Sequence, residues 1–154
     1  MHVDPRGQRF AALFSTVVLA LVLITGSVWL LAAQTLVFAV GAVLGLQYAP
    51  YELMFRWLVR HRVLRAGSPA ELEPAAPPRF AQAVGMVIGL IGVAGYGAGV
   101  TPLGIVATAA ALAAAFLNAA FGYCLGCQMY LLIRNLRPRR HVRLSADTDK
   151  EVPA

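Results

Sequence analysis

The fold is decided by residues 10–51, which read FAALFSTVVLALVLITGSVWLLAAQTLVFAVGAVLGLQYAPY. This stretch contains no Lys, Arg, Asp or Glu. A second and longer charge-free run follows at 80–133, so most of the 154-residue chain lies in two such runs. A hydrocarbon core about 30 Å thick takes about 20 helical residues per crossing, so each run is long enough to cross twice. The sequence therefore predicts an all-α, polytopic membrane protein.

We expect four transmembrane helices, arranged as two helical hairpins in a single membrane domain over residues 1–144. The spans are predicted at about residues 10–31, 36–50, 80–95 and 102–122. The first hairpin should turn near residues 33–35, and Pro50 should end or kink its second helix because proline removes a backbone hydrogen bond. Residues 51–79 are expected to connect the two hairpins, and residues 145–154 to form a disordered tail.

The distribution of charge predicts the orientation of the chain. The sequence has 13 Lys+Arg and 7 Asp+Glu, for a net charge of +6. All the basic residues fall at the N-terminus, in the connector or after the last span, and the opposite turns carry none. The positive-inside rule then places both termini and the connector in the cytoplasm. Basic residues at membrane edges favour contact with anionic lipids and do not indicate nucleic-acid binding.

The first apolar stretch, Phe10 to Leu31, is longer than the 7–15 residues of a signal-peptide core, so we expect it to be a membrane span. Residues 51–65 mix apolar and Arg residues, as a helix at the membrane surface does. Tyr51 and Trp57 are expected at the headgroup level. Glu52 is expected to pair with Arg56 at i,i+4, and a role in a proton relay is the alternative.

Pairs of glycines at i,i+4 spacing predict close helix packing. The pairs are Gly41/Gly45, Gly85/Gly89 and Gly122/Gly126. The alternative is that these are the ordinary glycines of membrane helices, which are common.

The two halves of the chain resemble each other weakly. Arg9-Phe10-Ala11 recurs in the second half as Arg79-Phe80-Ala81, and each copy opens a predicted hairpin. Each hairpin leads to a Met and an aromatic residue, Met54-Phe55 and Met129-Tyr130. This pattern indicates two parallel repeats related by an axis along the membrane normal, with chance as the alternative.

The segment Cys124-Leu125-Gly126-Cys127 is the feature that suggests a reaction, and it contains the only two cysteines of the chain. Cysteines three apart lie on one side of a helix, close enough for a disulfide when the geometry allows. In redox proteins this spacing lowers the pKa of one thiol, more so at a helix N-terminus. Gly122 is expected to end the fourth span, placing Cys124 in the first turn of a new helix, and Arg134 and Arg137 would add positive potential.

The main alternative is that the two cysteines are small apolar residues packed in a membrane helix. A zinc site is a further alternative, but two thiolates supply half of a tetrahedral shell, and His61 and His141 lack ligand-like spacing. A dimer that pooled four cysteines could complete such a site. We therefore expect no metal and no cofactor, and treat both histidines as solvated.

Asn118 and Gln128 are weaker candidates, because each lies close in sequence to the cysteine pair. Their amides could hydrogen-bond a thiolate or a substrate. The alternative is that they join neighbouring helices by hydrogen bonds.

Three stretches carry a resemblance to a known family. They are Val3-Asp4-Pro5-Arg6-Gly7-Gln8-Arg9-Phe10, then Pro77-Pro78-Arg79-Phe80-Ala81-Gln82, and Phe121-Gly122-Tyr123-Cys124-Leu125-Gly126-Cys127. With them the chain resembles the bacterial domain-of-unknown-function family 4395 over about residues 3 to 136. The resemblance implies a four-span membrane protein with this cysteine pair, found in the company of thioredoxin-like and sulfurtransferase proteins. It implies no established activity.

The leading hypothesis is a membrane-embedded thiol–disulfide or sulfur-handling component, with Cys124 as the attacking thiolate and Cys127 as the resolving thiol. The lipid bilayer and a cytoplasmic thioredoxin-like or rhodanese-like protein are the expected partners, and a homo-oligomer is left open. The predicted arrangement, four spans with a CxxC at the membrane interface, also looks like that of quinone-linked disulfide-forming enzymes. Those enzymes carry a second cysteine pair, which this chain lacks. The alternatives are a permease for a small sulfur species and a structural membrane subunit without catalysis.

Overall fold

The computed structural model describes residues 2–63 and 73–136, and this part of the chain is helical apart from two strands of two residues each. The helices are α1 (Pro5–Thr25), α2 (Val28–Val43), the short 3-10 helix η1 (Leu46–Tyr48), α3 (Pro50–Arg60), α4 (Ala76–Gly97), α5 (Thr101–Phe121) and α6 (Leu125–Leu136). The strands β1 (His2–Val3) and β2 (Glu73–Pro74) pair in antiparallel register, which joins the N-terminus to the start of α4. The expected all-α class is confirmed. The predicted tail at 145–154 lies outside the described residues.

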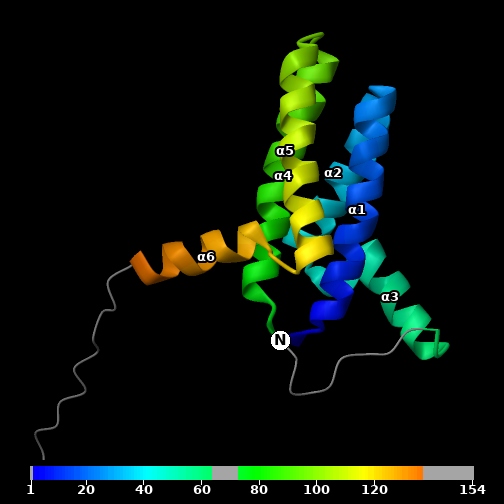
Figure 1. Ribbon diagram of the computed structural model, residues 1–154, viewed down its shortest axis with the longest axis vertical. Coiled ribbons are helices and arrows are strands. Elements are labelled where there is room, and N and C mark those ends of the chain that lie inside the picture. Colours follow the sequence, from blue (N-terminus) through cyan, green and yellow to red (C-terminus); the bar gives the residue numbers. More distant parts are fainter. Residues whose placement is uncertain (1, 64–72, 137–154) are drawn as a thin grey trace, which may run out of the picture.

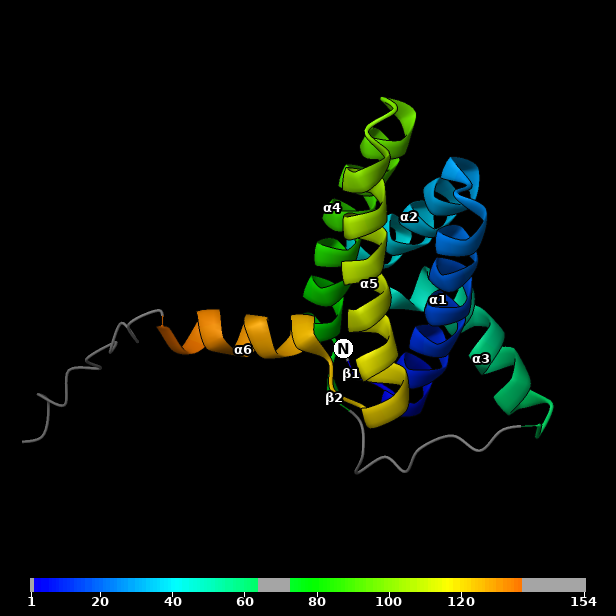
Figure 2. The same cartoon turned by 45° about the horizontal axis from the view of Figure 1, so that its top comes forward.

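The four long helices α1, α2, α4 and α5 form a bundle (Figure 1). The most extensive packing joins α2 to α4 and α1 to α5, and α4 also packs along α5. We call the end of the bundle where α1 and α4 begin the base. The helices α3 and α6 leave the bundle at the base on different sides, and the N-terminus lies there too (Figure 2).

The first turn of the bundle does not lie where the sequence predicted. The chain turns at Gly26, which ends α1 with φ 65°, and at Ser27, whose hydroxyl accepts from the backbone N–H of Leu30. A glycine in the left-handed region followed by an N-cap serine is a strong helix-to-helix break. The predicted turn at residues 33–35 is therefore wrong. Gln34 and Thr35 are polar, but they lie buried in the middle of α2.

The second helix also ends early. It stops at Val43, and Gly45 then adopts φ 109° before η1. Pro50 begins α3 instead of kinking a longer helix, because proline suits the first turn, where no backbone N–H is needed. The predicted second span at 36–50 is thus replaced by a helix over residues 28–43.

Three helices, α1, α4 and α5, are long and apolar enough to cross a membrane. The helix α2 is also apolar, but its 16 residues extend only about 24 Å. Large apolar side chains point outward from the bundle, such as Ile24 with 80% and Trp29 with 83% of its surface exposed. A fold that faces its surroundings with such residues is that of a membrane protein.

Glycines on one side of α4 allow α2 to pack closely. A Cβ added at Gly85 would lie 3.2 Å from the Phe38 ring, and one at Gly89 would clash with the side chain of Thr35. The packing predicted for Gly85/Gly89 is confirmed. In the other two pairs, the two glycines do not lie on one helix. Gly45 and Gly122 have positive φ and lie outside the helices that contain Gly41 and Gly126.

Two arginines tie the halves of the chain together at the base. Arg9 of α1 donates from Nη2 to the carbonyls of Ala119 and Ala120 at the end of α5, both at 3.3 Å. Arg79 of α4 donates from Nε and Nη2 to the last two carbonyls of α2, at 3.0 and 2.9 Å. Each arginine thus satisfies the terminal carbonyls of a helix from the other half, which otherwise lack partners.

The aromatic contacts repeat in the same way. The rings of Phe10 and Phe55 have centroids 5.7 Å apart, and those of Phe80 and Tyr130 have centroids 5.8 Å apart. These contacts pack α3 on α1 and α6 on α4. The sequence repeat is therefore a structural repeat, in which α1, α2 and α3 correspond to α4, α5 and α6.

Replacing Gly89 by Ala should destabilise the bundle, because the new methyl group meets the buried Thr35 side chain. We expect a loss of about 1–3 kcal/mol in the free energy of unfolding, as for overpacked sites. The matched control is Gly97→Ala at the end of α4, where an added Cβ meets nothing within 4 Å. Thermal unfolding in detergent checks the pair, and equal melting temperatures would contradict the α2–α4 packing described above.

Candidate functional site

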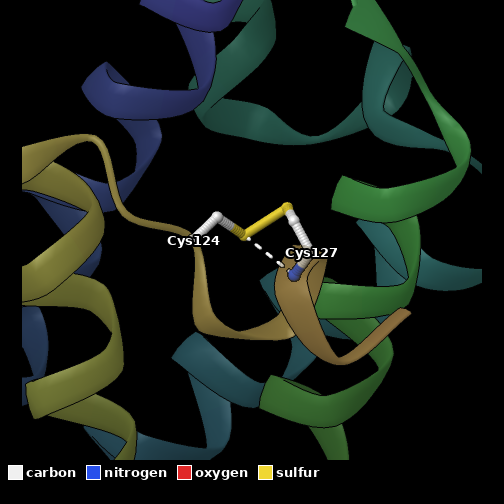
Figure 3. The surroundings of a disulfide bond; sticks show 2 residues. All are labelled: Cys124 and Cys127. Atoms are coloured by element: carbon white, nitrogen blue, oxygen red, sulfur yellow. Dashed lines mark hydrogen bonds between the residues drawn. A yellow bond between two sulfur atoms is a disulfide. The ribbon is translucent and has the colours of Figure 1, made fainter. Parts of the chain in front are cut away.

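The two cysteines lie at the start of α6 and form a disulfide (Figure 3). Cys124 directly precedes the helix, and Cys127 lies in its first turn. Their Cα atoms are 5.2 Å apart, within the range for disulfides. The sequence placed these residues together by spacing, and the structure shows the pair in its oxidised form.

Local structure explains why a helix begins at Cys124. Gly122 ends α5 with φ 68°, and its N–H donates to the carbonyl of Asn118 at 3.0 Å. The chain then starts α6, where the N–H of Gln128 donates to the Cys124 carbonyl at 3.0 Å. The expectation that Gly122 ends the span and that a new helix follows is confirmed.

The sulfur of Cys124 accepts a hydrogen bond from the backbone N–H of Cys127 at 3.3 Å. Cys124 therefore occupies the N-cap position, with its sulfur in the place of a capping oxygen. The backbone N–H of Cys127 and the positive end of the helix dipole therefore face the Cys124 sulfur. The two cysteines thus differ in their surroundings, because Cys124 caps the helix through its sulfur and Cys127 lies within the first turn.

Close packing on α4 holds the pair at the base. Gly126, between the cysteines, lies so near Ala81 of α4 that an added Cβ would be 2.6 Å from the Ala81 Cα. The Phe80–Tyr130 ring contact anchors the next turn of α6. A side chain at position 126 would therefore push the cysteine pair away from the bundle.

A cavity of about 280 Å³ lies between the helices at the base, and Cys124 forms part of its wall. The wall is mostly apolar and is built from α1, α2, α3, α4, α5 and the start of α6. Its polar members are Gln8, Ser15, Tyr51, Glu52, Gln82 and Asn118. Within the described part of the chain, no Lys, Arg or His lines it.

Two amides of this wall are buried without a hydrogen-bond partner. They are the Gln8 Nε2 donor and the Gln82 Oε1 acceptor. Buried polar atoms of this kind are almost always paired in proteins. The two amides therefore have unused hydrogen-bonding capacity beside the cavity.

A chain of hydrogen bonds crosses the bundle above these amides. The Tyr51 hydroxyl donates to Gln34 Oε1 at 2.7 Å, and Gln34 Nε2 donates to the Ser15 hydroxyl at 3.1 Å. This network directs the Tyr51 hydroxyl into the bundle, and the predicted place of Tyr51 at the headgroup level stays a prediction. Trp57 is exposed, with its ring 4.5 Å from the ring of His61.

Glu52 lies in α3, outside the long bundle helices, and is one of the residues that line the cavity. Burial raises the pKa of Glu52 above its usual value, the nearby charge of Asp4 raises it further, and Arg56 lowers it. Gly7 of α1 makes room for the carboxyl group, because a Cβ there would lie 2.6 Å from Glu52 Oε2. The effect of burial on the pKa of Glu52 is larger than that of the Arg56 charge, with which Glu52 was expected to pair.

The other residues predicted for the site lie in different places. Asn118 lines the cavity, whereas Gln128 is exposed and does not. His61 is exposed, and His141 and Arg137 lie outside the described residues. Over residues 2–63 and 73–136, no group of three or more His, Cys, Asp or Glu could hold a metal ion.

Sequence reasoning missed the cavity and the two unpartnered amides. Gln8 and Gln82 are neutral residues near the ends of apolar runs, and neither has a spacing that connects it to the cysteines. From the sequence, Arg9 and Arg79 are interpreted only as signals of membrane topology, but in the structure both cap the C-terminal ends of helices. The recurrence of Arg-Phe-Ala at the start of each half was the available signal for that second role.

The model of one protein family, described as domain of unknown function (DUF4395), matches residues 3–135. The chain therefore belongs to this family, in agreement with the resemblance seen in its sequence. No curated protein and no solved structure matches the chain.

The raised pKa of Glu52 gives a pH dependence of stability with a definite sign. The folded state holds the proton more tightly than the unfolded chain, so stability is greatest below the usual pKa near 4.5 and falls as pH rises through the raised pKa. Glu52→Gln should remove this fall, so its melting temperature should exceed that of the wild type more at pH 8 than at pH 4.5. Arg60→Gln on the same helix is the control, and parallel curves for Glu52→Gln and wild type would contradict the burial of this carboxyl group.

Proposed function

We propose that this member of the DUF4395 family is a membrane-embedded thiol–disulfide or sulfur-handling component that uses Cys124 and Cys127 at the cytoplasmic membrane face. The observation that carries the proposal is the position of the pair at the N-terminus of α6, where the Cys124 sulfur accepts a backbone N–H. A structural disulfide would not need a sulfur that caps a helix N-terminus beside a cavity. A reactive pair does, because the thiolate is the nucleophile in exchange.

The proposal includes four membrane crossings, by α1, α2, α4 and α5, with both termini and the 51–79 connector in the cytoplasm of a bacterium. The charged residues described by the structure lie at the base or on α3 and α6, and the turns at Gly26–Ser27 and Ala98–Val100 carry none. The positive-inside rule supports a cytoplasmic base. The short α2 fits a crossing because the bilayer can thin locally.

In this scheme Cys124 is the attacking thiolate and Cys127 the resolving thiol. The Cys124 thiolate attacks a sulfur of the partner's disulfide or persulfide and forms a mixed disulfide, while the partner's other sulfur leaves with the electron pair. Cys127 then attacks the Cys124 sulfur and releases the partner as a thiol. Its N-cap position favours the thiolate, so Cys124 is the better nucleophile at neutral pH and also the better leaving group in the reverse direction.

A cytoplasmic thioredoxin-like or rhodanese-like protein is the proposed partner. The helix that carries the pair extends away from the bundle at the base (Figure 1), so a soluble protein could approach it. Arg134 near the end of α6 adds positive charge to this surface. A partner with an acidic rim around its own cysteine would be attracted to it.

The two alternatives have less support. A permease for small sulfur anions would need cations along its path, and the described wall of the cavity has none. A structural subunit would offer its glycine faces to other proteins, but Gly85 and Gly89 are used inside this chain against α2. Thiol–disulfide exchange accounts for the cysteine pair, for the hydrogen bond of Cys124 at the N-cap and for the position of the pair at the base.

Alkylation with a mass-tagged maleimide tests the assignment of the two thiols. Purified protein should take up two tags only after reduction. At pH 7, Cys127→Ser, which leaves Cys124, should react about 3-fold faster than Cys124→Ser, because the helix N-terminus favours the Cys124 thiolate and the gain in thiolate fraction exceeds the accompanying loss of nucleophilicity. A rate profile over pH 5–10 separates pKa from exposure. A pair that never oxidises, or a Cys124 that is inert at pH 7, would contradict the proposal.

Labelling of single cysteines tests the orientation. In a chain that carries Cys124→Ser and Cys127→Ser, a membrane-impermeant maleimide should label Ser27→Cys and Val100→Cys from outside intact spheroplasts. It should label Arg60→Cys only after the membrane is permeabilised. Labelling of Arg60→Cys from outside, or protection of Ser27→Cys, would refute the cytoplasmic location of the base.

A further inference from the structure

The cavity beside the cysteine pair is close in size to a small-molecule site. Its volume of about 280 Å³ lies near the lower end of the range of about 300–1,000 Å³ for ligand pockets. Cys124 lines it, and Cys127 is not among its lining residues. A molecule in the cavity would therefore lie beside Cys124, the residue proposed above as the attacking thiolate.

The wall selects for an uncharged ligand. Alanine, valine, leucine, isoleucine and phenylalanine side chains make up most of it, and the described lining contains no cation. An anionic thiol or sulfur species would lose its hydration there without gaining a counter-charge. A ligand with an apolar body avoids this cost.

The two unpartnered amides add a second requirement. Gln8 offers an N–H that needs an acceptor, and Gln82 offers a carbonyl that needs a donor. Gln82 is held in place by α2, because even a Cβ on Gly41 would lie 3.1 Å from its Cγ. The ligand must therefore both accept and donate hydrogen bonds, in one form or in two forms that interconvert.

From these observations we propose that the cavity binds the ring of a lipid-soluble quinone, held between Gln8 and Gln82 beside Cys124. A quinone is uncharged and apolar, and its oxygens accept hydrogen bonds when oxidised and donate them as hydroxyls when reduced. Gln8 then serves the oxidised form and Gln82 the reduced form. This inference rests on the thiol–disulfide function proposed above and names the electron acceptor for it.

The electrons balance over two steps. A partner protein's dithiol first reduces the Cys124–Cys127 disulfide, so that one disulfide forms in the partner and one breaks here. The Cys124 thiolate then attacks a ring carbon of the quinone, and the Cys127 thiolate attacks the Cys124 sulfur. The new S–S bond displaces the ring, which keeps the electron pair and takes up two protons as the quinol. One cysteine pair is sufficient, because the partner's dithiol supplies the electrons directly.

The structural repeat supplies a carboxyl group to this reaction. Phe55 and Tyr130 occupy equivalent places in the two halves, because each ring packs on the phenylalanine of its own Arg-Phe-Ala copy. Ala49 and Cys124 each lie six residues before these rings, and Glu52 and Cys127 each lie three residues before them. Ala49 and Glu52 are therefore the equivalents of Cys124 and Cys127. Both Ala49 and Glu52 line the same cavity. Glu52 therefore lies where a carboxyl group can deliver protons to the reduced ring.

The test measures reoxidation of the cysteine pair without oxygen. Protein in detergent is reduced, freed of reductant and mixed with decylubiquinone, whose ring is fully substituted, and the pair is followed with a mass-tagged maleimide while quinol formation is followed by absorbance. We expect one quinol per disulfide formed. Gln8→Leu and Gln82→Leu should each slow reoxidation about 10-fold, the effect of about 1.4 kcal/mol of lost hydrogen bonding.

Two controls keep the variants interpretable. Gln128→Leu changes an exposed glutamine of α6, and Ala113→Leu changes an exposed alanine of α5, so both should react like the wild type. Ala114→Leu places extra volume in the cavity wall and should slow reoxidation without touching either amide. Oxidation by diamide should be equal in all five variants, which checks that each one folds with a competent cysteine pair.

The outcomes separate this inference from the function on which it rests. If diamide oxidises the pair and decylubiquinone does not, the quinone site is refuted while thiol–disulfide exchange stands. If the quinone oxidises wild type, Gln8→Leu, Gln82→Leu and Ala114→Leu at the same rate, the cavity is not the site. If neither oxidant affects the pair, both proposals fail.

Discussion

The arrangement of this protein depends on how the ends of its apolar helices satisfy their backbone carbonyls. In a membrane no water is available inside the bilayer to pair with these groups, so donors must come from the protein or from its edge. Arg9 and Arg79 supply them, each to a helix of the other half. The same interactions bring the starts of α1 and α4 to the ends of α5 and α2. Two sequence repeats thereby become one bundle with a common base.

The chemistry of the base follows from the next helix end along the chain. Gly122 ends α5 and Cys124 begins α6, so a sulfur atom takes the role that an oxygen usually has at an N-cap. The close contact of Gly126 with Ala81 keeps this helix start against the bundle. As a result, a cysteine pair that could have been an inert part of a membrane helix lies at a helix N-terminus, beside a cavity. Position, not only spacing, makes it a candidate reactive pair.

The repeat also shows how the two halves differ in function. The equivalent helices α3 and α6 both begin beside the cavity, and α3 brings Ala49 and Glu52 where α6 brings Cys124 and Cys127. The carboxyl group of Glu52 is partly buried, which favours its protonated form. One half of the base thus holds the cysteine pair and the other holds an acid, and Cys124 and Glu52 line a single, mostly apolar cavity.

The sequence by itself determined that the protein is helical, that its apolar runs are of membrane length, that its charges gather at one side and that Cys124 and Cys127 lie within bonding reach. These properties depend on local composition and on residues a few positions apart, which a linear reading captures. It placed the first turn wrongly, because polar Gln34 and Thr35 look like a turn until α1 and α4 cover them. Only the tertiary structure decided that Gln8, Gln82 and Cys124 share a cavity, because these residues come from three separate segments of the chain. Their proximity depends on helix packing between distant segments, which no spacing in the chain records.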